Sequence, residues 1–151
     1  MTSYFRRLSA IIFLLSLPIA VQASDLTGLW QEYDDDTGAM VALIRIEKMA
    51  DNVFEGKIER LFPDKNEHVD RLCSHCRGAL HNQPLQGLRI LSGMKRKDEL
   101  VFDGGEILDP DDGKTYRCRL RLSQDGNTLE VTGFLNLNWI GQSEIWRRNS
   151  E

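Results

Sequence analysis

The cysteines are the clearest candidates for chemistry in this chain. Cys73 and Cys76 stand three positions apart, and Cys118 is the third cysteine. The stretch around the pair holds the histidines of the chain: His68, His75 and His81. In an exported chain, two cysteines this close most simply form a local disulfide, or one of them pairs with Cys118. Zinc is the alternative, because it accepts thiolates and imidazoles, but the second paired motif that completes such sites is missing.

Other uses of the cysteine pair conflict with its surroundings. Redox catalysis needs the pair at a helix N-terminus, where the thiol pKa is lowered, and no helix is predicted after Cys76. Covalent haem attachment needs a histidine directly after the second cysteine, and Arg77 occupies that position. We therefore favour a structural disulfide over zinc, and we expect neither a metal nor a cofactor.

Three further patterns have a simpler structural interpretation. Asp36-Thr37-Gly38 matches the active-site tripeptide of aspartic proteases, but that chemistry needs two such carboxylates, so a turn is predicted. The acidic runs 34–36 and 109–112 lack the spacing and the closing glutamate of a calcium loop. A basic stripe at strand spacing indicates a solvated face paired with acids of neighbouring strands: Arg117, Arg119 and Arg121. We find no catalytic signature and do not predict an enzyme.

The first 23 residues have the layout of a cleaved signal peptide. Arg6 and Arg7 supply a positive start, residues 10–21 are apolar, and Val21-Gln22-Ala23 offers small residues for cleavage before Ser24. The apolar run is about a dozen residues, shorter than the roughly 20 of a membrane-spanning helix. We therefore expect a periplasmic or secreted protein with no transmembrane segment after cleavage.

The mature chain, residues 24–151, is predicted to be one domain. Its length suits a single core, and no repeat or change in composition marks a boundary. Removal of Arg6 and Arg7 leaves 17 basic and 23 acidic side chains, a net charge of −6. This charge disfavours nucleic acid and anionic membrane surfaces as partners. We expect a monomer.

A β-strand pattern recurs through the mature chain. Its clearest example follows the predicted turn 109–113, where apolar side chains alternate with the basic stripe: Tyr116, Cys118, Leu120 and Leu122. Eight such strand candidates are joined mostly by short turns, with no convincing helix among them. We predict an all-β fold, an eight-stranded antiparallel up-and-down barrel, with residues 62–84 as its one long connection.

The same alternation predicts which side chains face the interior. An eight-stranded barrel is just wide enough to be filled by side chains or to hold one small ligand. The inward residues expected to contact a ligand are Trp30, Ile44, Phe54, Phe102, Tyr116, Leu120 and Val131. Gly56, Gly87 and Gly133 leave gaps that favour a cavity, although bulges and kinks also explain glycine in strands.

Several motifs resemble a known group when taken in order. Gly28-Leu29-Trp30 resembles the Gly-x-Trp signature of lipocalin-type, or calycin-like, barrels. The further motifs are Pro84-Leu85-x-Gly87-Leu88-x-Ile90-Leu91, Gly104-Gly105-x-Ile107-x-Asp109-Pro110-x-x-Gly113-Lys114-Thr115-Tyr116, Gly133-Phe134, and the closing segment from Gly141 to Trp146-Arg147. Together they are similar to the exported bacterial family called domain of unknown function 2147 (DUF2147), over nearly all of 30–148.

The resemblance implies a lipocalin-like barrel in an exported protein, and it implies no activity. In lipocalin-type barrels the tryptophan plugs one end, and a basic residue of the last strand lies across it. Trp30 is therefore expected to close one end, together with Arg147 or Arg148. The closing segment departs from the family pattern at Gln142-Ser143-Glu144, where arginine and threonine are commoner.

These observations favour a protein that binds a small apolar or amphipathic molecule inside the barrel. One alternative is an envelope interaction protein with a filled barrel, acting through its outer surface and its long loop. Another is a metal or thiol site at Cys73 and Cys76. Whether the interior is hollow or filled separates the first two hypotheses.

Overall fold

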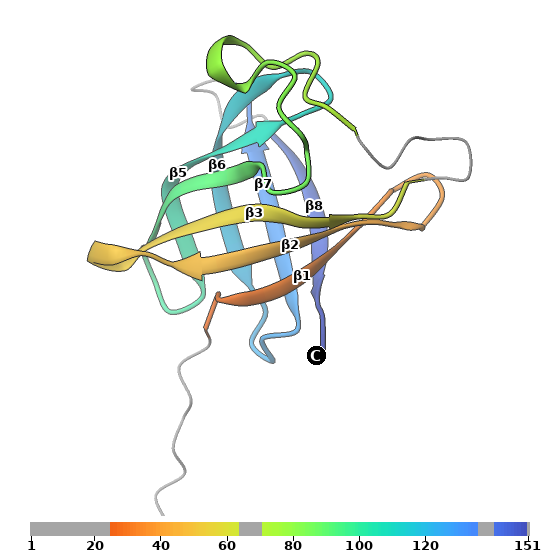
Figure 1. Cartoon of the computed structure of the whole chain (residues 1–151). Helices are drawn as coiled ribbons and strands as arrows, with labels where there is room; N and C mark the ends of the chain where they lie inside the picture. Colours follow the sequence, from red (N-terminus) through yellow and green to blue (C-terminus); the bar gives the residue numbers. More distant parts are fainter. Residues whose placement is uncertain (1–24, 64–70, 136–140, 151) are drawn as a thin grey trace, which may run out of the picture.

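The computed structural model describes residues 25–63, 71–135 and 141–150 (Figure 1). Within these ranges the chain forms one closed barrel, in which each strand pairs antiparallel with the next and β8 returns to β1. The strands are β1 Gly28–Tyr33, β2 Met40–Lys48, β3 Val53–Leu61, β4 Arg89–Arg96, β5 Val101–Asp109, β6 Lys114–Leu122, β7 Thr128–Phe134 and β8 Gly141–Arg148. This confirms the predicted eight-stranded up-and-down barrel.

Alternation along the strands explains the core. In β6, Cys118 and Leu120 are buried, whereas the intervening Arg119 pairs with Asp103 on the outer surface, at 2.7 Å between Nη2 and Oδ2. The predicted signal segment, residues 1–23, lies outside the described residues. Among the residues that are described, no helix is long and apolar enough to cross a membrane.

Most connections are tight turns. The Asp36-Thr37-Gly38 tripeptide lies in the β1–β2 turn, where the Asp34 carboxylate accepts from the Thr37 amide at 2.7 Å. The exception is the connection between β3 and β4, which runs from 62 to 88, four residues beyond the predicted 62–84. Leu88 is buried like a strand residue, but it belongs to this connection, because β4 begins at Arg89. The Leu88 carbonyl accepts from the Ile58 amide at 2.9 Å.

One end of the barrel is closed around Trp30. The indole is fully buried and donates from Nε1 to the Leu26 carbonyl at 3.0 Å. The Arg148 guanidinium lies 4.3 Å from the centre of the Trp30 ring. It also donates to the carbonyl oxygens of Gly126, Thr27 and Asp25, at 2.6, 2.8 and 2.6 Å. Arg148 thus joins the β6–β7 turn, the N-terminal segment and the last strand at one point.

Arg147 has a different position. Its guanidinium lies 5.1 Å from the centre of the Tyr33 ring, on the outer side of the barrel, and the residue is exposed. Of the two arginines considered for closure, Arg148 is therefore the one over Trp30.

Replacement of Arg148 should weaken the fold far more than replacement of its neighbour. Arg148→Met removes a cation over an indole and leaves three carbonyl groups without this donor, so we expect a loss of about 2–4 kcal/mol in the free energy of unfolding. Arg147→Met should cost under about 1 kcal/mol, because it removes one exposed contact. Urea unfolding of both variants measures the difference, and equal losses would contradict the assigned role of Arg148.

Candidate functional site

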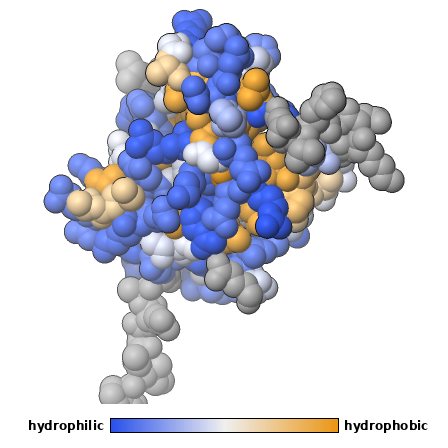
Figure 2. All heavy atoms as spheres, viewed as in Figure 1, coloured by the Kyte–Doolittle hydropathy of each residue, from blue (hydrophilic) through white to orange (hydrophobic). Residues whose placement is uncertain are grey.

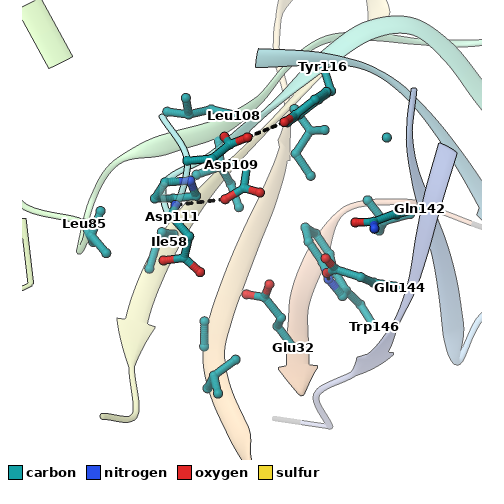
Figure 3. A pocket seen from close by; sticks show the side chains of 18 of the residues that line it. Glu32, Ile58, Leu85, Leu108, Asp109, Asp111, Tyr116, Gln142, Glu144 and Trp146 are labelled. Atoms are coloured by element: carbon teal, nitrogen blue, oxygen red, sulfur yellow. Dashed lines mark hydrogen bonds between the residues drawn. The ribbon is translucent and has the colours of Figure 1, made fainter. Parts of the chain in front are cut away.

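The interior is divided into a packed part and a hollow part. Near the closed end, the rings of Phe54 and Phe102 meet edge to face with centres 5.1 Å apart. At the opposite end lies a cavity of about 450 Å³ (Figure 3). This volume falls within the ~300–1,000 Å³ typical of small-molecule sites. The barrel is therefore neither entirely hollow nor entirely filled.

The cavity wall is part aliphatic and part acidic. The aliphatic part is formed by Val41, Ala42, Ile58, Leu61, Leu85, Ile90, Ile107, Leu108, Val131 and Leu135. The polar part is formed by Glu32, Arg71, Asp109, Asp111, Asp112, Tyr116, Gln142 and Glu144. Pro110, Gly133 and Trp146 complete the lining. The residues come from the barrel strands, from the β3–β4 connection and from the β5–β6 turn, which lie opposite Trp30, so the cavity belongs to the end that the tryptophan does not close.

Two of the seven residues predicted to contact a ligand line this cavity: Tyr116 and Val131. The other five are fully buried nearer the closed end and do not line it: Trp30, Ile44, Phe54, Phe102 and Leu120. Alternation determines which face a side chain is on, but it carries no information about height along the barrel axis. Gly133, one of the glycines expected to leave space, does line the cavity.

A cross-linked loop, residues 71–88, lies over the hollow end of the barrel (Figure 1). Cys73 and Cys76 form a disulfide, which confirms that expectation. Neither sulfur is therefore available as a zinc thiolate, and within the described ranges no group of three or more potential metal ligands is present. His68 lies outside the described residues. Cys118 is a buried free thiol, and burial raises its pKa to about 12.

Two contacts hold this loop against the β5–β6 turn. Arg71 donates to the Asp111 carboxylate at 3.2 Å. Gly113 has a φ of +70°, and a Cβ there would overlap the backbone carbonyl of His75. Glycine is thus required both for the turn conformation and for the close approach of the loop. Arg71 and Leu85 of this loop, together with residues 110–112 of the turn, form the roof of the cavity.

Two carboxyl groups face each other inside the cavity, across the junction of the first and last strands. Glu32 follows Trp30 by two positions in β1, and Glu144 precedes Trp146 by two positions in β8, so alternation turns all four side chains inward. Figure 3 shows both carboxyl groups directed into the same space. The Trp146 indole donates to Glu144 Oε2 at 3.2 Å, which orients that carboxyl.

The surroundings of this pair favour a retained proton. Burial against the aliphatic wall, reinforced by the nearby charges of Glu144, Asp111 and Asp109, raises the pKa of Glu32 to about 7. Partial burial also raises the pKa of Glu144, although much of that side chain is exposed to solvent. Desolvation and like charge both disfavour the ionised form of a carboxyl group. Near neutral pH, a fraction of the protein molecules therefore retains one proton on this pair of carboxyl groups.

The remaining acids of the wall already have partners. Asp112 accepts from the Tyr116 hydroxyl and pairs with Lys114 at 3.2 Å. Asp111 pairs with Arg71, and Asp109 Oδ1 accepts from the Asp111 amide at 2.8 Å. No ion pair joins Glu32 or Glu144 to a basic side chain among the residues described. These two carboxyls are thus the part of the acidic wall that is free to act on a ligand.

Sequence reasoning did not identify Glu32 or Glu144 as site residues. Their signal was available, because each stands two positions from an inward tryptophan on a strand. Acidic residues lie mostly at protein surfaces, so residue type alone does not mark a glutamate as part of a cavity.

A closed antiparallel barrel with an internal cavity at one end defines the lipocalin class of fold. A family profile described as "Uncharacterized protein conserved in bacteria (DUF2147)" matches residues 28–148. The chain belongs to this family. A search of curated proteins finds no significant match.

A solved structure supports the fold. The chain is similar to one described as "Protein HP1028 from the human pathogen Helicobacter pylori belongs to the lipocalin family", with a TM-score of 0.69 and 20% sequence identity. The similarity covers 84% of each chain. At this identity the comparison establishes the lipocalin-like fold, and it confirms the architecture expected from the Gly-x-Trp motif.

The disulfide makes a simple prediction about thiol reactivity. Without reductant, the native protein should not react with a thiol reagent, because Cys118 is buried. The denatured protein should react with about one equivalent, because Cys118 is then exposed. After reduction, the denatured protein should react with about three equivalents, since Cys73 and Cys76 are released. Titration with a chromogenic disulfide measures each state. Three reactive thiols before reduction would contradict the pairing.

Glu32 should impose a pH dependence on stability. Its folded-state pKa is raised from the model-compound value of 4.5 to about 7, so the folded state binds more protons than the unfolded state between these values. Stability associated with Glu32 is therefore present below pH 4.5 and is lost as the pH rises through 7. Glu32→Gln should raise the melting temperature at pH 8 by about 3–6 °C, and less at pH 5.

Thermal unfolding of wild type and Glu32→Gln across pH 5–8 measures this effect. Glu106→Gln is the control, because Glu106 is exposed on β5 and does not line the cavity. If Glu32→Gln changed the melting temperature by the same amount at every pH from 5 to 8, the raised pKa of Glu32 in the folded protein would be contradicted.

Proposed function

We propose that this protein binds a small amphipathic molecule in the hollow end of its barrel. The observation that carries this proposal is the 450 Å³ cavity, whose lining combines aliphatic side chains with polar and charged ones. Sites for small ligands have this composition, because the apolar wall supplies burial and the polar groups fix orientation. The lipocalin-like fold agrees with such a role, although fold alone does not determine function.

The alternative of an entirely filled barrel is less well supported. Its packed part, around Phe54 and Phe102, stabilises the fold, while the other end keeps space that side chains do not occupy. Figure 2 shows a largely hydrophilic surface, with apolar surface gathered beside the ends of β2 and β3. Those strand ends contribute Val41 and Leu61 to the cavity lining.

We also propose that the protein works in the periplasm or outside the cell. The support is the signal-peptide pattern of residues 1–23. The Cys73–Cys76 disulfide agrees with this location, because disulfides persist in oxidising compartments. The net charge of −6 for residues 24–151 likewise agrees with a role that involves no nucleic acid.

Filling the cavity should weaken binding and leave the fold intact. A Cβ at Gly133 would meet Ile107 and Tyr116 at 3.6 and 3.7 Å, which is ordinary contact, so a larger side chain can extend into the cavity. Gly133→Leu should weaken binding of the neutral fluorescent probe N-phenyl-1-naphthylamine by at least about tenfold.

Thr132→Val is the matched control, because Thr132 is on the same strand and its hydroxyl bonds to Ser143 on the outer surface at 2.8 Å. This variant should bind the probe like wild type. Fluorescence titration, with circular dichroism to verify folding, measures both. Failure of wild type to bind any neutral apolar probe at one site would contradict the proposed function.

A further inference from the structure

The charge inside the cavity restricts what the ligand can be. Five acidic residues line the wall against one basic residue, Arg71, whose guanidinium pairs with Asp111. An anionic ligand would have to approach several carboxylates without a free cation to receive it. In a partly desolvated space such like-charge contacts are strongly unfavourable. The wall therefore disfavours fatty acids and other anionic amphiphiles.

The carboxyls of Glu32 and Glu144 differ from the other acids of the wall, because they neither pair with a cation nor hold the β5–β6 turn. Asp111 and Asp112 pair with Arg71 and Lys114, and Asp109 accepts from the Asp111 amide in that turn. Glu32 and Glu144 come from different strands, are directed into the same space, and lie beside aliphatic side chains (Figure 3). Two converging carboxyls in an apolar setting form a site for a single positive charge, since their mutual repulsion is relieved when a cation lies between them.

We propose that the ligand is a cationic amphiphile, with its positive group between Glu32 and Glu144 and its apolar body along the wall of Ile58, Ile90 and Val131. This inference rests on the proposed function and specifies its ligand class. The Trp146 ring lines the cavity beside Glu144. An aromatic face next to carboxylates suits ammonium groups, which are attracted to the ring as well as to the negative charge.

A bare metal ion fits the same place less well. Glu32 and Glu144 supply carboxylate oxygens only, and no group of three or more potential metal ligands occurs in the described part of the chain. The extended aliphatic wall would also have no role in binding an ion. An organic cation uses both parts of the cavity.

Binding of such a cation should depend on pH. The groups facing Glu32 are Glu144 from β8, Asp109 from the end of β5 and Asp111 from the β5–β6 turn, with Arg71 beyond them on the roof. A bound cation favours the ionised carboxylates, so binding releases a proton when Glu32 is protonated. For a ligand with a permanent charge, affinity should therefore rise as the pH increases through about 7.

The experiment compares three probes with an eight-carbon chain: octyltrimethylammonium, octanol and octanoate. Each displaces N-phenyl-1-naphthylamine from the cavity in a fluorescence titration, at pH 5.5 and at pH 8. At pH 8 we expect octyltrimethylammonium to bind at least about tenfold more tightly than octanol. Octanoate should bind most weakly, and the preference for the cation should decrease at pH 5.5.

Glu32→Gln/Glu144→Gln should remove the preference for the cation and still bind N-phenyl-1-naphthylamine, which shows that the cavity is intact. Each single substitution, Glu32→Gln or Glu144→Gln, should lower the preference, so the test does not depend on the double variant folding. Glu106→Gln, an exposed residue outside the cavity lining, should retain the full preference.

The outcomes separate the two proposals. If octanol and octyltrimethylammonium bind equally well while the neutral fluorescent probe binds, the cationic ligand is excluded and the binding function stands. If octanoate binds best, the inference is likewise overturned. If the fluorescent probe itself finds no site in wild type, the proposed function fails, and the inference fails with it.

Discussion

The closure of the barrel at Arg148 is the constraint on which the rest of the structure depends. The first and last strands are paired at only two positions, Trp30 with Arg148 and Gln31 with Arg147. Arg148 reinforces this short junction by covering Trp30 and donating to three carbonyl groups, one in the β6–β7 turn and two in the segment before β1. Closure is thereby concentrated at one end. Beyond the two pairs no ladder joins β1 to β8, and it is there that Glu32 and Glu144 face the interior.

The distribution of side-chain size along the barrel follows the same division. The inward residues near the closed end include Trp30, Phe54 and Phe102, which are large enough to meet across the interior. The opposite end has Ala42 and Gly133 at inward positions, where they leave space between strands that are held at a fixed spacing. An empty space lacks the contacts that stabilise a packed core. The packed end therefore supplies most of the stability of the barrel. The hollow end contributes less, and the cross-linked loop covers it.

Periodicity was sufficient to predict the barrel, because each strand has one buried face and the connections are mostly tight turns. It was insufficient to locate the cavity. Ile44 and Leu120 alternate inward just as Val131 does, and they pair across the sheet with Ile58 and Val131, which line the cavity. The boundary between the packed and the hollow part therefore passes between neighbouring strands, and alternation along a single strand does not reveal it. The nearby cysteines predicted the disulfide, since spacing alone brings them together. Nothing in the spacing indicated that the segment they cross-link would lie against the turn at Gly113.

The two uncompensated carboxyls make physical sense as part of a binding site. A core built only for stability would exclude Glu32, because desolvation and the neighbouring acids raise its pKa to about 7 and so penalise its ionised form. Perturbed ionisable groups in a cavity are a common mark of functional sites. Without a ligand, a shared proton reduces the charge between Glu32 and Glu144. A bound cation replaces that proton, so the pair carries one net negative charge, rather than two, whether the cavity is empty or filled.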